Sequence, residues 1–196
     1  MNCSDIAGLR RRQAIPSTAA RKQIIIRPAS AADGSRIAAI HCESWRDTYA
    51  DVLDPAFLAG PIEADRRTLW ADRFAHPYPN QTVLVAESAG HEALGFVCFY
   101  RDSDARWGSL IDNLHVLPAL RGHNIGEKLI RAAVAELDPA RAFHLWVFEA
   151  NAGAIRFYER LGGQRVERTL DDMPAARGAP VLRMAWPSAA SLLERD

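Results

Sequence analysis

The chain alternates between short apolar runs and longer stretches whose apolar residues recur every three or four positions. Short runs of this kind predict β-strands, and the longer periodic stretches predict amphipathic helices. Strands are predicted at 23–27, 82–87, 94–101, 109–116, 143–148, 164–169 and 179–186, and helices at 32–50, 63–74, 125–137 and 152–161. The resulting order, β-αα-βββ-α-β-α-ββ, predicts an α/β (α+β) domain.

The junction between the fourth predicted strand and the third predicted helix carries the clearest chemical signal. Pro118 closes the strand, and the loop Arg121-Gly-His-Asn-Ile-Gly126 opens the helix. A helix start has backbone N–H groups without partners and carries partial positive charge, so small loop residues there favour phosphate binding. Asn124 stands between the two glycines, and Asn is the residue after glycine that best tolerates positive φ.

Two other kinds of phosphate-binding loop do not fit this junction. A nucleoside-triphosphate loop would end in Gly-Lys-Ser/Thr, and a dinucleotide fold would place an acidic residue at a set distance after the loop; neither feature is present. A second motif, Asn151-Ala-Gly-Ala-Ile-Arg-Phe-Tyr-Glu-Arg-Leu-Gly-Gly163, follows the apolar run at 143–148. Two motifs in this order make a chance pattern improbable.

These motifs resemble the RxxGxG and NxxAxxFYExxGF segments of the GNAT family of acyl-CoA N-acyltransferases. The first departs from the family pattern at Asn124, where the family has glycine, and the second at Gly163, where phenylalanine is usual. The resemblance covers residues 24 to about 186. It implies the GNAT fold, a mixed central sheet of about seven strands with four helices.

The resemblance also implies contacts with acetyl-CoA as cosubstrate. Backbone N–H groups of the loop would face the pyrophosphate, while the preceding strand would pair through its backbone with the pantetheine arm. The alternative for the glycines is a simple turn and packing role, and the asparagine of the second motif could be a helix N-cap, a ligand or both. The implied contact residues are Leu114, His115, Val116, Arg121, Gly122, His123, Asn124, Ile125, Gly126, Asn151 and Tyr158.

The two proton-transfer steps have different candidates. Tyr158 matches the family tyrosine that donates a proton to the departing sulfur of coenzyme A, and the alternative is that it only packs its helix under the sheet. The base that some family members carry on the central strand falls at Leu110, which cannot accept a proton. Strand alternation returns Asp112 to the same face as Leu110 and points Asn113 and His115 the other way, so Asp112 is the candidate base.

Alternatives to this base remain open. A carboxylate at Asp112 could instead serve a neighbouring strand or loop through hydrogen bonds. A chain of water molecules, or an amine that arrives already neutral, would remove the need for a base.

The acceptor pocket is expected between the first two helices and the later strands. Trp45 and Tyr49 form an aromatic pair spaced by four residues, and Glu43 and Asp47 stand nearby to attract an ammonium group. The alternative is that these aromatic residues belong to the core. His41, on the inward stripe of the same predicted helix, is expected to be a hydrogen-bonded core residue.

Length and composition narrow the setting. A chain of 196 residues with 48% apolar residues fits one globular domain. Its 24 basic and 24 acidic residues balance, which argues against nucleic-acid or membrane partners. Three widely spaced cysteines and six scattered histidines predict no disulfide framework and no metal site. The start of the chain lacks the apolar centre of a signal peptide, which favours a cytoplasmic location.

We expect a mobile N-terminal arm at 1–23, the GNAT domain at 24–187 and a C-terminal tail at 188–196. The basic run in the arm either touches an anionic partner or is simply solvated. The expected activity is transfer of the acetyl group of acetyl-CoA to a primary amine, without a covalent enzyme intermediate. The amine could belong to a small molecule, an amino acid or a protein N-terminus, and the enzyme could form a homodimer. The alternative is a catalytically silent acyl-CoA-binding module.

Overall fold

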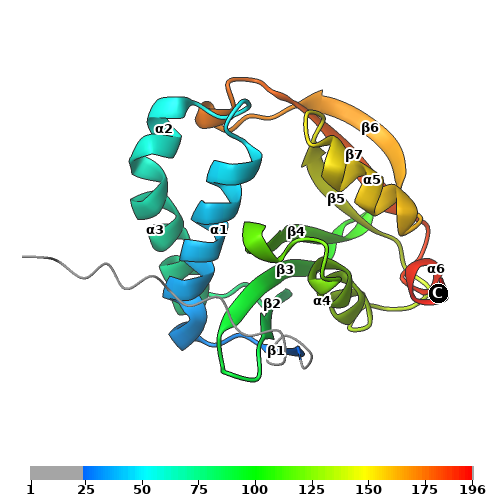
Figure 1. Ribbon diagram of the computed structural model, residues 1–196. Helices are drawn as coiled ribbons and strands as arrows, with labels where there is room; N and C mark the ends of the chain where they lie inside the picture. Colours follow the sequence, from blue (N-terminus) through cyan, green and yellow to red (C-terminus); the bar gives the residue numbers. More distant parts are fainter. Residues whose placement is uncertain (1–23, 196) are drawn as a thin grey trace, which may run out of the picture.

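A computed structural model describes residues 24–195, so the arm expected at 1–23 lies outside the described residues. Within the described chain the strands form one seven-stranded sheet in the order β1-β2-β3-β4-β5-β7-β6 (Figure 1). The strands are β1 (Ile25–Pro28), β2 (Gln81–Glu87), β3 (Ala93–Asp104), β4 (Gly108–Val116), β5 (Phe143–Phe148), β6 (Gln164–Leu170) and β7 (Pro180–Trp186). The β4–β5 pair is parallel and the other pairs are antiparallel, which confirms the predicted mixed sheet.

Helices cover both faces of this sheet. The four predicted helices are α1 (Gly34–Thr48), α3 (Pro61–Ala75), α4 (Ile125–Val134) and α5 (Ala152–Arg160). Apolar residues of α4 and α5 pack into the largest core cluster with one face of the strands. Residues of α1 and α3 pack with Val83, Val85 and Phe96, which point to the other face. This division places α1 opposite α4 and α5, on either side of β4 (Figure 1).

Two short helices were not predicted. Helix α2 (Pro55–Ala59) starts with proline, and the side chain of Asp54 caps it by accepting from the backbone N–H of Ala56 at 2.8 Å. Helix α6 (Ala190–Leu193) lies in the segment that the sequence left as a tail, and the side chain of Leu192 is fully buried in the main core. Helices of four or five residues are too short to show a helical period, so pattern alone does not find them.

The strands β4 and β5 pair only at one end. Their register joins Ser109–Ile111 to Phe143–Leu145 and stops there. Beyond this point the two strands separate (Figure 1), so no strand pairs with the β5-facing edge of β4 at residues 112–116 within the described sheet. The opening between them is the place where a cleft can form. No helix in the described residues is long and apolar enough to cross a membrane.

Candidate active site

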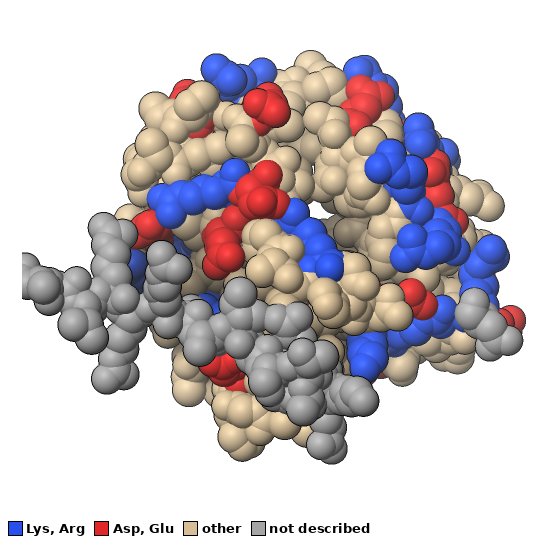
Figure 2. Space-filling view, in the orientation of Figure 1, with Lys and Arg blue, Asp and Glu red and all other residues tan. Residues whose placement is uncertain are grey.

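A cleft of about 890 Å³ opens where β4 and β5 separate. Its walls come from the last part of α1, the second half of β4, the loop before α4, the strand β5, helix α5, and the end of β6 with the loop that follows it. Figure 2 shows the molecule hollowed near its centre, with both basic and acidic side chains at the margin. Residues of both motifs therefore line one cavity.

The loop before α4 has the geometry of an anion-binding turn. Gly122 has φ 80°, and Asn124, which precedes the helix as its N-cap, has φ 58° and ψ 14°. The expectation that Asn124 would adopt the left-handed conformation is confirmed. None of the backbone N–H groups of residues 122–127 donates to another group of the described chain. These donors are left available at the positive end of the α4 dipole.

The side chain of Arg121 turns away from these N–H groups. Its guanidinium forms an ion pair with Asp47, donates to Oγ1 of Thr48 at 2.8 Å and lies 3.5 Å from Oγ of Ser44. All three partners belong to the last part of α1. The arginine of the first motif thus joins the loop to α1 through its side chain.

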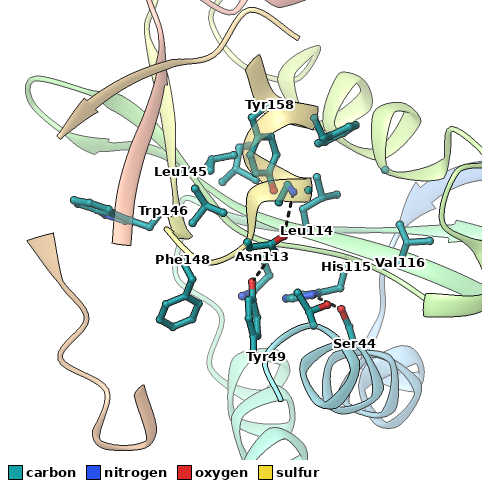
Figure 3. Close-up of a pocket in the computed structure, with 18 of the residues that line it drawn as sticks. Ser44, Tyr49, Asn113, Leu114, His115, Val116, Leu145, Trp146, Phe148 and Tyr158 are labelled. Atoms are coloured by element: carbon teal, nitrogen blue, oxygen red, sulfur yellow. Dashed lines mark hydrogen bonds between the residues drawn. The ribbon is translucent and has the colours of Figure 1, made fainter. Parts of the chain in front are cut away.

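Tyr158 projects from α5 toward the cleft (Figure 3). Burial raises the pKa of its hydroxyl above the ordinary value, so the proton is retained near neutral pH. No side-chain hydrogen bond within residues 24–195 involves this hydroxyl, which leaves it free to donate into the cavity. Asn151 is the N-cap of α5: its Oδ1 accepts from Ala154 N at 3.0 Å, and its Nδ2 lies 3.5 Å from the Tyr49 hydroxyl oxygen.

The departure of the second motif at Gly163 has a packing reason. A Cβ atom at this position would lie 2.6 Å from Cζ2 of Trp186, so the indole occupies the space that a side chain at 163 would need. The indole also stacks on Phe143 and donates to the carbonyl of Leu161 at 2.8 Å. A bulky residue at 186 therefore fills the space beside the end of α5, and glycine is required at 163.

Strand β4 contains a bulge that changes which side chains share a face. Asn113 pairs with Cys98 and Ile111 pairs with Phe99, so Asp112 is an extra residue on β4. Arg73 from α3 lies 2.7 Å from Oδ2 of Asp112 and donates to Oδ1 of Asn113 at 2.8 Å. The prediction that Asn113 points away from Asp112 is wrong, because a bulge breaks strict alternation.

His115 also lies on the α1 side, against the sequence prediction. Its Nδ1 is 3.0 Å from Oγ of Ser44, and its ring stacks on His41 with centroids 4.5 Å apart (Figure 3 shows the contact with Ser44). Burial lowers the pKa of His115 to about 3, with the charges of Arg121 and Arg66 acting in the same direction. The ring is therefore neutral at ordinary pH and is a weak proton acceptor.

His41 is a core residue, as expected. It is fully buried, and its Nδ1 accepts a hydrogen bond from Nε1 of Trp70 at 3.1 Å. Burial, and then the nearby His115, lower its pKa well below the ordinary value. Because the indole N–H can only donate, the proton of neutral His41 sits on Nε2.

Trp45 and Tyr49 both line the cleft, and we call the part of the cavity beside them the acceptor end. Tyr49 packs edge-on against Phe148, and the guanidinium of Arg66 lies over the ring of Trp45 at 4.5 Å. The carboxylates expected to attract an ammonium group do not line this cavity. Asp47 is paired with Arg121, and Glu43 borders a separate shallow groove.

Several residues at this end were missed by the sequence analysis. The cleft is also lined by Trp146, Phe148, Leu170, Asp171 and Asp172. The first two belong to a strand that the sequence predicts with the correct bounds, and their period-two spacing puts them on one face. No local pattern shows that the loop after β6 folds back to the same cavity. No group of three or more His, Cys, Asp or Glu side chains in residues 24–195 is arranged to hold a metal ion.

A sheet that separates beside a helix-start loop, with a tyrosine facing the opening, is the arrangement that the motif resemblance implies for an acyl-CoA acyltransferase. The family model described as acetyltransferase (GNAT) family matches residues 38–163. A probable N-acetyltransferase of Mycobacterium tuberculosis is 31% identical over 143 residues, which cover 70% of this chain and 78% of that protein. The chain belongs to the GNAT family and is an acyltransferase.

Solved structures agree on the fold. The apo form of YjaB from Escherichia coli matches with a TM-score of 0.64 and 24% identity, covering 85% of this chain and 99% of that one. The PaiA N-acetyltransferase of Thermoplasma acidophilum, solved in complex with coenzyme A, matches with a TM-score of 0.64 and 19% identity, covering 83% and 98%. At these identities the likeness shows the fold alone.

Proposed function

We propose that this enzyme transfers the acetyl group of acetyl-CoA to a primary amine by direct attack within a ternary complex. One observation carries the proposal: free N–H groups at residues 122–127, the unpaired edge of β4 and the hydroxyl of Tyr158 all border the same cleft. The N–H groups suit a pyrophosphate, and an unpaired strand edge suits the amides of a pantetheine arm. These donors therefore fit coenzyme A without rearrangement of the loop.

In the proposed reaction the amine nitrogen forms a bond to the thioester carbonyl carbon, and the carbon–sulfur bond breaks. The sulfur leaves as a thiolate and takes the hydroxyl proton of Tyr158. The amine nitrogen loses one proton to water, and the Tyr158 phenolate takes a proton back from water, so the net products are an amide and a free thiol and the enzyme is unchanged. Burial keeps the tyrosine protonated until the thiolate forms.

Asp112 stays the candidate proton acceptor, but its surroundings limit that role. The carboxylate already forms an ion pair with the guanidinium of Arg73, 2.7 Å away, so it is not free to approach the amine as an unpaired group. His115 is disfavoured more strongly, because a proton there would place a buried cation near Arg121 and Arg66. We therefore propose that Asp112 orients the amine and that the proton leaves through water or before binding.

The acceptor end favours an amine with an apolar body. Trp45, Tyr49 and Phe148 line this end together with Trp146 and Leu170, and the last two are 36% and 61% exposed. The carboxylates of Asp171 and Asp172 also line this end, and neither forms an ion pair with another described residue, so they can attract the ammonium form of an arriving amine. A small primary amine that carries an aromatic or aliphatic group fits best.

Thiol release separates this proposal from a silent coenzyme A-binding module. Purified protein would be incubated with acetyl-CoA and a panel that contains phenethylamine, spermidine, leucine amide and a short peptide. We expect free thiol to appear with phenethylamine or leucine amide. Coenzyme A binding in calorimetry with no thiol release from any amine would favour the silent module, and no binding at millimolar coenzyme A would overturn both.

A further inference from the structure

One guanidinium connects the phosphate-type loop to α1. Arg121 contacts Ser44, Asp47 and Thr48, which lie three and four residues apart and so share one side of the helix. A cation at this place also complements the negative C-terminal end of the helix dipole. Within the described residues, no other side chain of residues 121–126 hydrogen-bonds to α1.

The same turn of α1 carries the acceptor end of the cleft. Trp45 follows Ser44 and lines the cavity, and Tyr49 follows Thr48. The hydroxyl of Tyr49 in turn lies 3.5 Å from the side-chain nitrogen of Asn151, the cap of the helix that carries Tyr158 (Figure 3). Residues 44–49 therefore stand between the loop and the place where an amine would bind.

We propose that Arg121 is a positioning residue that couples cofactor occupancy to the shape of the acceptor pocket. This inference rests on the function proposed above. Phosphates bound by the backbone N–H groups of residues 122–127 would fix the position of the Cα atom of Arg121. The contacts with Asp47 and Thr48 then hold the last turn of α1, and with it Trp45 and Tyr49. By thermodynamic linkage the coupling is reciprocal, so a bound acceptor also strengthens coenzyme A binding.

The competing role for Arg121 is direct contact with a phosphate. In that case its guanidinium would leave α1, and changes at Thr48 or Asp47 would not matter for coenzyme A. In the positioning role, Asp47 and Thr48 are as important as Arg121 for the coupling between the loop and α1. The variants Arg121→Gln and Asp47→Asn/Thr48→Val therefore separate the two roles, since the second leaves every group of the loop in place.

Hydrogen exchange with coenzyme A alone tests the coupling without a known acceptor. In the wild-type protein we expect coenzyme A to slow exchange in residues 121–127 and, by about fivefold or more, in residues 44–49 as well. In both variants the protection of 121–127 should persist, while that of 44–49 is lost. The matched control is Arg101→Gln, because Arg101 makes the same kind of contacts, an ion pair with Glu136 and a 2.8 Å bond to Oγ1 of Thr82, far from the cleft.

The results distinguish a failure of the proposed coupling from a failure of the proposed function. No protection of 121–127 in the wild-type protein would refute the proposed function. Protection of 121–127 without protection of 44–49, or protection of 44–49 that survives in both variants, would refute the coupling and leave the function standing. Loss of coenzyme A affinity in Arg121→Gln but not in Asp47→Asn/Thr48→Val would assign Arg121 to the phosphates and overturn the positioning role.

Discussion

Two glycines give a matched test of whether the loop before α4 binds phosphate. Gly122 and Gly178 have φ of 80° and 70°, and a Cβ atom added to either would meet no heavy atom within 4 Å. Replacement by alanine therefore has no steric cost beyond the backbone conformation itself. That cost is about 1–2 kcal/mol for an ordinary residue in the left-handed region. Both variants should lose this amount in urea unfolding, or about 2–4 °C in Tm for each kcal/mol.

The two variants should differ in coenzyme A binding. Strain at 122 moves N–H groups that would face the pyrophosphate, and each hydrogen bond to a charged acceptor contributes about 1.5–3 kcal/mol. Loss of one such bond weakens binding on the order of 10- to 100-fold in calorimetry for Gly122→Ala. Gly178→Ala lies in the turn before β7 and should bind coenzyme A as the wild-type protein does.

The Gly178→Ala variant shows whether a change in coenzyme A affinity is specific to the loop before α4. If Gly122→Ala and Gly178→Ala are destabilised equally and both keep wild-type affinity for coenzyme A, then Gly122 is only a turn residue. The role of the loop as a pyrophosphate site would then be refuted, whatever the activity of the enzyme.

Three further outcomes follow from the same geometry. Tyr158→Phe should lower kcat by about 10²-fold or more. The unfolding free energy and the coenzyme A affinity should stay unchanged, because the hydroxyl forms no hydrogen bond within the described chain. An unchanged kcat would remove its role as acid. Asp112→Asn should raise KM for the amine and leave the shape of the pH–rate profile unaltered, whereas loss of the acidic limb would identify a true base. The pKa of His115 falls from about 6.5 in the unfolded chain to about 3 in the fold. The unfolded chain thus binds the extra proton between these values, and stability should fall as pH drops through this window, by at most about 1.4 kcal/mol per pH unit. His115→Gln should flatten that slope in urea titrations, and an equal slope in the variant would show that the residue is not buried neutral.

The sequence predicts best the elements whose signals are local. Strand β5 has the predicted bounds, Phe143–Phe148, because it is a continuous apolar run followed by a helix cap at Asn151. The left-handed conformation of Asn124 was also predictable, since it depends on one residue type. The loop and the tyrosine helix could be placed in one cavity because both belong to motifs of known order.

What failed depends on partners that are distant in the sequence. The bulge at Asp112 is defined by its register against β3, and a period of two cannot reveal an extra residue. For the same reason the faces of Asn113 and His115 were predicted wrongly. The pairing of Asp47 with Arg121 joins residues 74 positions apart, so a carboxylate that was expected to attract the ammonium group is occupied.

The charges on the α1 side of β4 explain which chemical step the protein can assist. Arg73 holds the carboxylate of Asp112, and Arg66 and Arg121 act with burial to keep His115 neutral. The guanidinium groups favour negative charge in this region, and His115 resists taking up a proton. Across the cleft, a tyrosine whose pKa is raised by burial keeps its proton until an anion forms nearby. In the proposed reaction the fold therefore assists departure of the thiolate more than deprotonation of the amine, and the substrate must supply a neutral nitrogen.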